Sequence, residues 1–130
     1  MAHLILPDSN IFIGALRAGT DPFQQFVPEI DEREFGTCGM VVMEVCRGVR
    51  DPNLLRKIKE RFSVMIYIPT SNQIWERVTH LAWSLDRQGI VLPAPDLIIA
   101  ACALQADAAV LTADAHFRMI PGLDVLESLP

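Results

Sequence analysis

Short apolar or β-branched stretches alternate along the chain with longer segments in which apolar residues recur at steps of three and four. The short stretches predict buried strands at residues 3–6, 35–39, 64–68 and 108–111, with a weaker fifth at 123–126. The longer segments predict helices at residues 11–16, 40–49, 53–62, 74–87 and 97–105. This alternation predicts one α/β domain over residues 1–130, with a mainly parallel central sheet of four to five strands flanked by helices.

Composition narrows the class of protein. The chain is 51% hydrophobic and 21% charged, which is typical of a globular domain with its own core. Its longest apolar run, residues 97–104, is too short for a membrane span, and Pro7 with Asp8 interrupts the amino-terminal apolar stretch before a signal peptide can form. Three cysteines without C-x-x-C spacing lie among apolar neighbours. We therefore expect reduced core cysteines in a cytoplasmic protein.

Four acids follow strand ends or lie in apolar helices. Asp8 follows the first predicted strand, Asp114 follows the fourth, Asp96 begins the last predicted helix, and Glu44 lies among Met, Val and Cys. In parallel sheets ligands bind beyond the carboxyl ends of the strands, so these acids are expected to meet there. Each also has a structural interpretation. Asp8 and Asp114 could each cap the start of a helix, and the helix after Asp114 would span residues 115–119. Asp96 could stabilise its helix by interacting with the helix dipole. Glu44 could lie on the exposed edge of its helix.

Four carboxylates at one sheet edge would repel one another unless a cation were bound. Hard divalent ions with oxygen ligands, Mg²⁺ or Mn²⁺, are their natural partners. A zinc site is not indicated, because His3, His80 and His116 are far apart in the sequence and are interpreted as packing residues.

Three motifs, D-S-N-I-F-I, M-E-V-C-R-G and P-D-L-I-I-A-A-C-A-L followed by L-T-A-D-A-H-F, resemble the PIN-domain ribonucleases, and among them the small VapC-like toxins. The resemblance spans essentially the whole chain. It implies a PIN-like fold and assigns roles to residues that match the family's motifs. The acidic cluster, catalytic and metal-binding, would be Asp8, Glu44, Asp96 and Asp114, with Asn10 and Thr112 as supporting polar residues.

The resemblance implies a Mg²⁺- or Mn²⁺-dependent endoribonuclease with one or two ions, acting as the toxin of a toxin–antitoxin pair. Its expected partners are RNA, a cognate antitoxin and a second copy of the chain. Two alternatives stay open, a housekeeping PIN-domain nuclease and a non-catalytic PIN scaffold. Two other phosphate-handling folds fit less well. A receiver domain needs a lysine near its last strand, yet none follows Lys59, and a haloacid-type phosphatase needs an acid where Asn10 stands.

The formal net charge of −5 is unfavourable for RNA binding, although bound divalent ions would neutralise most of it. Residues 47–61 carry six of the eleven basic residues. From them we select Arg47, Arg50, Lys57 and Lys59 as possible RNA contacts. A solvated helix face with an Arg56–Glu60 pair is the alternative.

Helix 74–87 carries two apolar stripes. The first contains Ile74, Val78, Leu81 and Leu85, and the second contains Trp75, Thr79 and Trp83. Core packing is the preferred interpretation of both stripes, and an interface for a second subunit or an antitoxin segment is the alternative.

Overall fold

The computed structural model describes residues 4–29 and 32–130, which form a five-stranded sheet of order β3-β2-β1-β4-β5. Every neighbouring pair of strands is parallel, which confirms the predicted α/β class. In chain order the strands are β1 (Leu4–Pro7), β2 (Glu34–Cys38), β3 (Ile66–Ile68), β4 (Ala109–Leu111) and β5 (Val125–Leu126).

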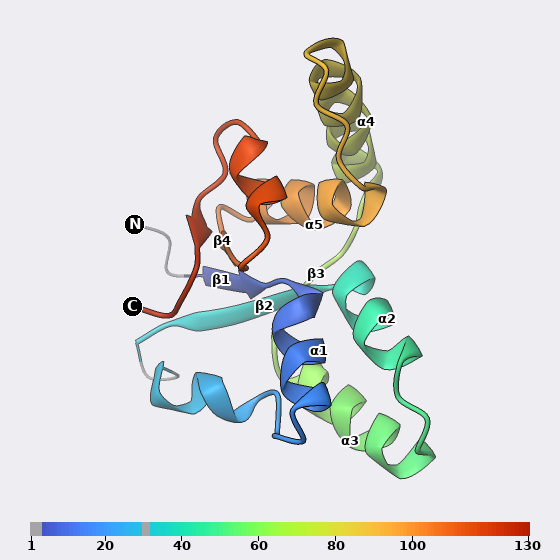
Figure 1. The fold of residues 1–130 in the computed structure, drawn as a ribbon, viewed down its shortest axis with the longest axis vertical. Coiled ribbons are helices and arrows are strands. Elements are labelled where there is room, and N and C mark those ends of the chain that lie inside the picture. Colours follow the sequence, from blue (N-terminus) through green and yellow to red (C-terminus); the bar gives the residue numbers. More distant parts are fainter. Residues whose placement is uncertain (1–3, 30–31) are drawn as a thin grey trace.

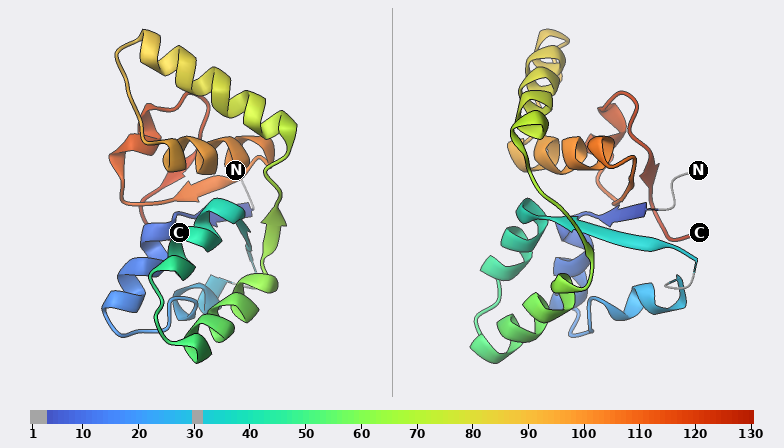
Figure 2. Two further views of the ribbon diagram at one scale, coloured as in Figure 1. Left: turned by 90° about the vertical axis from the view of Figure 1, so that its right-hand side faces the viewer. Right: turned by 180° about the vertical axis from the view of Figure 1, so that it is seen from behind.

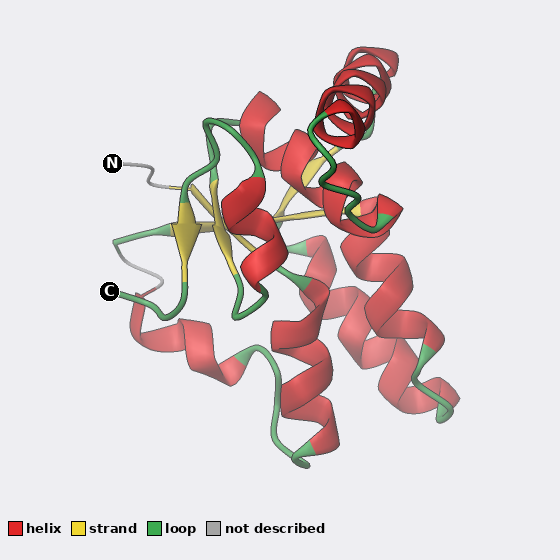
Figure 3. Ribbon diagram, turned by 45° about the horizontal axis from the view of Figure 1, so that its top comes forward, coloured by secondary structure: helices red, strands yellow, loops and turns green. Residues whose placement is uncertain are grey.

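Helices cover both faces of the sheet (Figures 1, 2 and 3). One face carries α1 (Ser9–Arg17), the short helix η1 (Gln24–Glu29), α2 (Gly39–Arg47) and α3 (Pro52–Ser63). The other carries α4 (Asn72–Arg87), α5 (Ala94–Gln105) and η2 (Ala115–Met119). Within the described residues, no helix is both long and apolar enough to cross a membrane.

The core explains why α5 is apolar on all sides. Seven consecutive residues, 97–103, are buried because α5 lies between the sheet and α4. On the opposite face Phe12 of α1 contacts the rings of Phe23, Phe26 and Phe62, at centroid distances of 5.4, 5.6 and 5.0 Å. Cys38 and Cys102 are buried and Cys46 is half-buried, all with free thiols, as predicted.

Most predicted element boundaries differ from the structure by one to three residues, and residue 3 lies outside the described residues. Helix α1 begins at Ser9, directly after Asp8. Helix α3 continues to Ser63, and Val64 is its C-cap residue, whose backbone amide donates to the carbonyls of Arg61 and Phe62. Strand β3 therefore starts only at Ile66. Gly89 follows the C-cap residue Gln88 of α4 with a φ of +80°, a left-handed conformation that favours glycine after a helix. The helix η1 was not predicted.

The second stripe of α4 was interpreted wrongly. Ile74, Val78 and Leu85 are buried as predicted, but Trp75 and Trp83 are 47% and 58% exposed. Helix α4 lies outside α5, at the end of the molecule opposite α3 (Figures 1 and 2). Because α4 packs chiefly on α5, only one side of it is covered, and the tryptophan side faces solvent.

Topology concentrates polar groups at the carboxyl ends of β1 and β4. From the central strand β1 the chain passes over one face of the sheet through α1 to β2, and it returns to β4 over the opposite face through α4 and α5. The helices therefore diverge between β1 and β4, which leaves room beyond their ends. Asp8 follows β1 and Thr112 follows β4, and the Asp8 amide continues the strand pairing by donating to the Leu111 carbonyl at 2.9 Å.

Candidate metal centre

A buried hydroxyl joins the two strand ends. Thr112 donates its hydroxyl hydrogen to Asp8 Oδ2 at 3.0 Å and accepts from the Asp114 backbone amide at the same distance. Asp8 and Thr112 are each 2% exposed. One side chain therefore fixes both the Asp8 carboxylate and the turn that carries Asp114. These contacts are consistent with the supporting role predicted for Thr112, which stays a prediction.

A second hydroxyl connects Asp8 to helix α2. The Ser9 hydroxyl donates to Glu44 Oε1 at 3.0 Å and lies 3.4 Å from Asp8 Oδ1. Ser9 is buried and Glu44 is half-buried, because α1 packs beside α2 and turns this side of α2 toward β1. Glu44 is therefore not on an exposed helix edge, and the side chain of Ser9 bridges it to Asp8.

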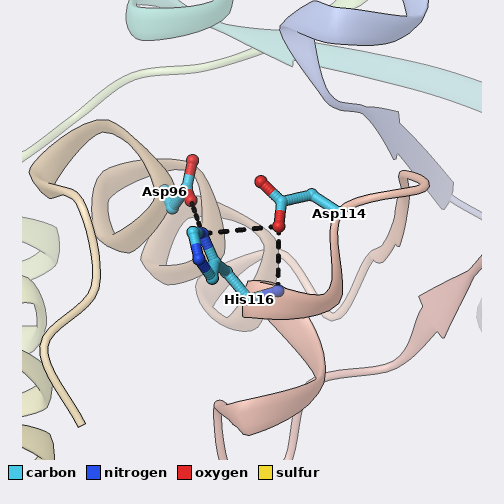
Figure 4. A group of neighbouring side chains, drawn as sticks. All are labelled: Asp96, Asp114 and His116. Atoms are coloured by element: carbon cyan, nitrogen blue, oxygen red, sulfur yellow. Dashed lines mark hydrogen bonds and ion pairs between the residues drawn. The ribbon is translucent and has the colours of Figure 1, made fainter.

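A histidine connects the other two acids (Figure 4). His116 Nδ1 lies 3.1 Å from Asp96 Oδ2 and 3.3 Å from Asp114 Oδ1. Asp96 occupies the first turn of α5, while Asp114 caps η2 by accepting from the His116 amide at 2.9 Å. One ligand atom from each of these three residues lies within 4.8 Å of the others. The structure thus brings Asp96 beside Asp114 through η2.

The electrostatics link three of the acids, Asp8, Asp96 and Asp114. Burial raises the pKa of the Asp8 carboxyl, opposed by the Thr112 hydroxyl, and the negative charge of Asp114 raises it further. Burial also raises the pKa of Asp96, opposed by His116, and the charges of Asp114 and Asp8 add to the increase. Across residues 4–29 and 32–130, neither Lys nor Arg forms an ion pair with any of the four acids.

This donor set fits a divalent cation. Carboxylate oxygens from several elements converge where positive charge is missing, and oxygen donors are the preferred ligands of Mg²⁺ and Mn²⁺. The buried Asp8 carboxylate would be stabilised most, because a cation would offset both its desolvation and its repulsion by Asp114.

A helix-capping role does not exclude an acid from the cluster. Asp114 is a cap, as one interpretation predicts, and it also contacts His116. Asp8 occupies the N-cap position of α1, yet its carboxylate makes no side-chain capping hydrogen bond. Asn10 is exposed and, in the described part of the chain, hydrogen-bonds to none of the acids.

His116 was missed at this site, since the sequence interpretation made it a packing residue. Its side chain is 44% exposed and contacts two acids. The available signal was its position two residues after Asp114, where a short helix starts. His80 is not a packing residue either, because it is exposed on α4.

The predicted basic residues lie on α2, α3 and the loop between them. Arg47, Arg50, Lys57 and Lys59 are all exposed. No Arg56–Glu60 ion pair occurs among the described residues, but the exposure of these side chains agrees with a solvated helix face, so that alternative stays open.

Comparison with known proteins identifies the family and similar folds. The model of the PIN domain matches residues 5–123. VapBC2 from Rickettsia felis, solved with a DNA fragment from its promoter, has a TM-score of 0.79 at 19% identity, over 95% of this chain and 97% of that one. A toxin–antitoxin complex from Klebsiella pneumoniae has a TM-score of 0.70 at 26% identity, over 94% and 95% of the two chains.

VapC20 from Mycobacterium tuberculosis, described as a toxin that cleaves the sarcin–ricin loop, has a TM-score of 0.68 at 14% identity, over 97% of this chain and 99% of that one. No curated protein sequence matches the chain. Because the family model spans most of the sequence, the protein belongs to the PIN-domain family.

Proposed function

We propose that the protein is a Mg²⁺- or Mn²⁺-dependent endoribonuclease and the toxin of a toxin–antitoxin pair. The observation that carries the proposal is the group of four carboxylates at the carboxyl edge of the sheet, which pair with no Lys or Arg of the described residues. PIN domains are typically metal-dependent nucleases, and the similar VapC20 is described as an RNA-loop cleaving toxin.

In this proposal Asp8, Glu44, Asp96 and Asp114 hold one or two ions and are the catalytic residues. When bound, such ions make water nucleophilic near neutral pH and neutralise the charge of phosphoryl oxygens. The chain itself holds the carboxylates in place in advance. Thr112 fixes Asp8 Oδ2, and Ser9 fixes Glu44 Oε1. Such pre-positioning matters because the partners that orient ligands strongly affect metal affinity.

The substrate is proposed to approach over α2 and α3. Arg47 lies three residues after Glu44 on α2, and Lys57 and Lys59 lie on the neighbouring α3. Together with Arg50 these exposed cations would contact RNA phosphates, whose binding favours clustered Lys and Arg. Asn10, exposed at the start of α1, is assigned a polar contact with the substrate or ion.

A cognate antitoxin and a second copy of the chain are the proposed protein partners, and the cytoplasm is the proposed compartment. Several similar structures are toxin–antitoxin complexes. The exposed Trp75 and Trp83 on α4 offer aromatic surface, which is enriched at protein interfaces. Mass measurement of the purified protein would test the dimer.

The direct test is cleavage of structured RNA by the purified protein with Mg²⁺ or Mn²⁺, repeated in excess chelator. Cleavage should require the ion and should be lost in Asp114→Asn. The matched control Asp86→Asn removes an exposed acid from α4 and should cleave normally. Cleavage that persists in chelator would exclude the proposed mechanism. A protein that binds RNA but never cleaves it would favour the non-catalytic scaffold.

A further inference from the structure

The histidine of the site lies close enough to two of the acids for the three side chains to share one ion. His116 Nδ1 faces one oxygen of each of two carboxylates, Asp96 Oδ2 at 3.1 Å and Asp114 Oδ1 at 3.3 Å. The three side chains point toward one another from α5 and from the start of η2 (Figure 4). Other residues of the cluster, Asp8 and Glu44, are held by hydroxyl groups instead.

The spacing of these atoms agrees with ligands that share one ion. Nitrogen and oxygen ligands lie about 2.0–2.2 Å from a small divalent cation, so two neighbouring ligands at a right angle are about 3.0 Å apart. The two observed N···O separations, 3.1 and 3.3 Å, are slightly longer than this value. A small closing movement of these half-buried side chains would therefore bring the atoms to the spacing of ligands that share an ion.

The backbone limits how far the histidine can move away. The His116 amide donates to Asp114 Oδ1 at 2.9 Å, so the oxygen that faces the ring also anchors the residue's main chain. The neighbouring Phe117 is fully buried and fixes the helix η2 against the core. Ring and carboxylate thus form one local unit.

From this geometry we infer that His116 is a nitrogen ligand of the ion, together with Asp96 and Asp114, and that the site prefers Mn²⁺ to Mg²⁺. The inference rests on the proposed ion-dependent function and specifies which ion that site takes. Carboxylate and water ligands suit both ions, but imidazole suits transition metals and is a poor partner for Mg²⁺. A centre built from carboxylates alone would lack this preference.

A histidine that only positions the two carboxylates would produce the same distances through hydrogen bonds, so the test must separate the two roles. His116→Asn keeps a short polar side chain whose amide can donate to both carboxylates, yet it removes the imidazole nitrogen. His80→Asn is the matched control, because His80 is exposed on α4 and contacts Ser84.

The experiment is calorimetric titration of the apoprotein with Mn²⁺ and with Mg²⁺, and pulsed electron paramagnetic resonance of the Mn²⁺ complex. Wild type and His80→Asn should show coupling of Mn²⁺ to a histidine ¹⁴N nucleus. His116→Asn should lose that coupling, and its preference for Mn²⁺ over Mg²⁺ should be lost, because an all-oxygen site suits both ions.

Each contrary outcome identifies what fails. Tight Mn²⁺ binding without nitrogen coupling in the wild type would overturn the role of His116 and leave the ion-dependent nuclease standing. An unchanged preference in His116→Asn would also overturn it, since it would assign the residue to positioning. A wild-type protein that binds neither ion would overturn the inference and the proposed function together.

Discussion

Asp8 and Thr112 are each 2% exposed, whereas the side chains of Asp96, Asp114 and His116 are 15%, 30% and 44% exposed. The first region of the cluster is held by buried hydroxyl groups, and the second by a solvent-accessible imidazole. Removal of a hydroxyl group from the buried region should lower stability, because the buried polar groups that it leaves unpaired cost free energy. Changes in the open region should affect ion binding with little effect on folding, since water can replace the lost contacts.

Asp8→Asn should produce the largest effect, and it should separate activity from stability within the buried region. We expect RNA cleavage to fall by about 100-fold or more, at the upper end of the effects seen when partners of metal ligands are removed. In chelator the variant should unfold at the same temperature as the wild type or higher, because a buried charge is removed. Single-turnover cleavage and thermal unfolding measure the two quantities. Cleavage within tenfold of the wild type would refute the role of Asp8.

Thr112→Val should show what the buried hydroxyl contributes to folding. Valine keeps the shape but leaves Asp8 Oδ2 and the Asp114 amide without their partner. We expect the free energy of unfolding to fall by about 1–3 kcal/mol, measured by urea unfolding in chelator. The comparison variant His116→Asn lies in the open region and should change it by less than about 0.5 kcal/mol. Equal losses in the two variants would remove the distinction between the regions.

Dependence on pH should expose the cost of burying the Asp8 charge in the apoprotein, to which repulsion by Asp114 adds. The pKa of Asp8 is higher in the folded state than in the unfolded state, where it is near the ordinary 3.8. The folded state therefore binds more protons at this carboxyl above that pH, so the contribution of Asp8 to the stability of the apoprotein falls as pH rises through this range. Asp8→Asn should show a shallower decline than the wild type in urea unfolding followed from pH 4 to pH 7. A stability that rises more steeply in the wild type would contradict this sign.

Ser9→Ala should have a smaller effect on stability than Thr112→Val. It removes the donor to Glu44 Oε1, but Glu44 is only half-buried and water can reach it. We expect a loss of about 0.5–1.5 kcal/mol in the free energy of unfolding, smaller than that of Thr112→Val. A larger loss than in Thr112→Val would indicate that the link to α2, rather than the link to β4, holds the buried region together.

The sequence predicts the fold well because its signals are local. The apolar run at 97–103 can only be a buried element, and Asp8 directly after an apolar strand can be placed from the order of elements alone. The start of β3 was harder to predict from the sequence, because Val64 is β-branched, as is typical of a strand, yet it is the C-cap residue of α3. Whether such a residue continues a helix or begins a strand is decided by the neighbouring turn.

Other features depend on contacts between distant segments. His116 lies beside Asp96 only because η2 folds against the start of α5, so its neighbours in the sequence do not reveal that contact. Trp75 and Trp83 are exposed because α4 packs chiefly on α5 and stands clear of the sheet, although their spacing resembles that of a buried stripe. Periodicity identifies the faces of a helix but does not establish which of them is covered.

The central claim, that the four acids form an ion site, is tested most directly by melting curves of the wild type and Asp96→Asn, each in chelator and in Mn²⁺. Asn also suits the start of a helix, so a purely structural Asp96 would tolerate the change with little effect on either curve. If Asp96 is one of several crowded carboxylates, its neutralisation in Asp96→Asn should leave the apoprotein equally stable or more stable. The account predicts that Mn²⁺ raises the melting temperature of the wild type clearly more than that of Asp96→Asn, because binding to the folded state stabilises it. A variant that melts lower in chelator and gains as much from Mn²⁺ as the wild type would contradict the account.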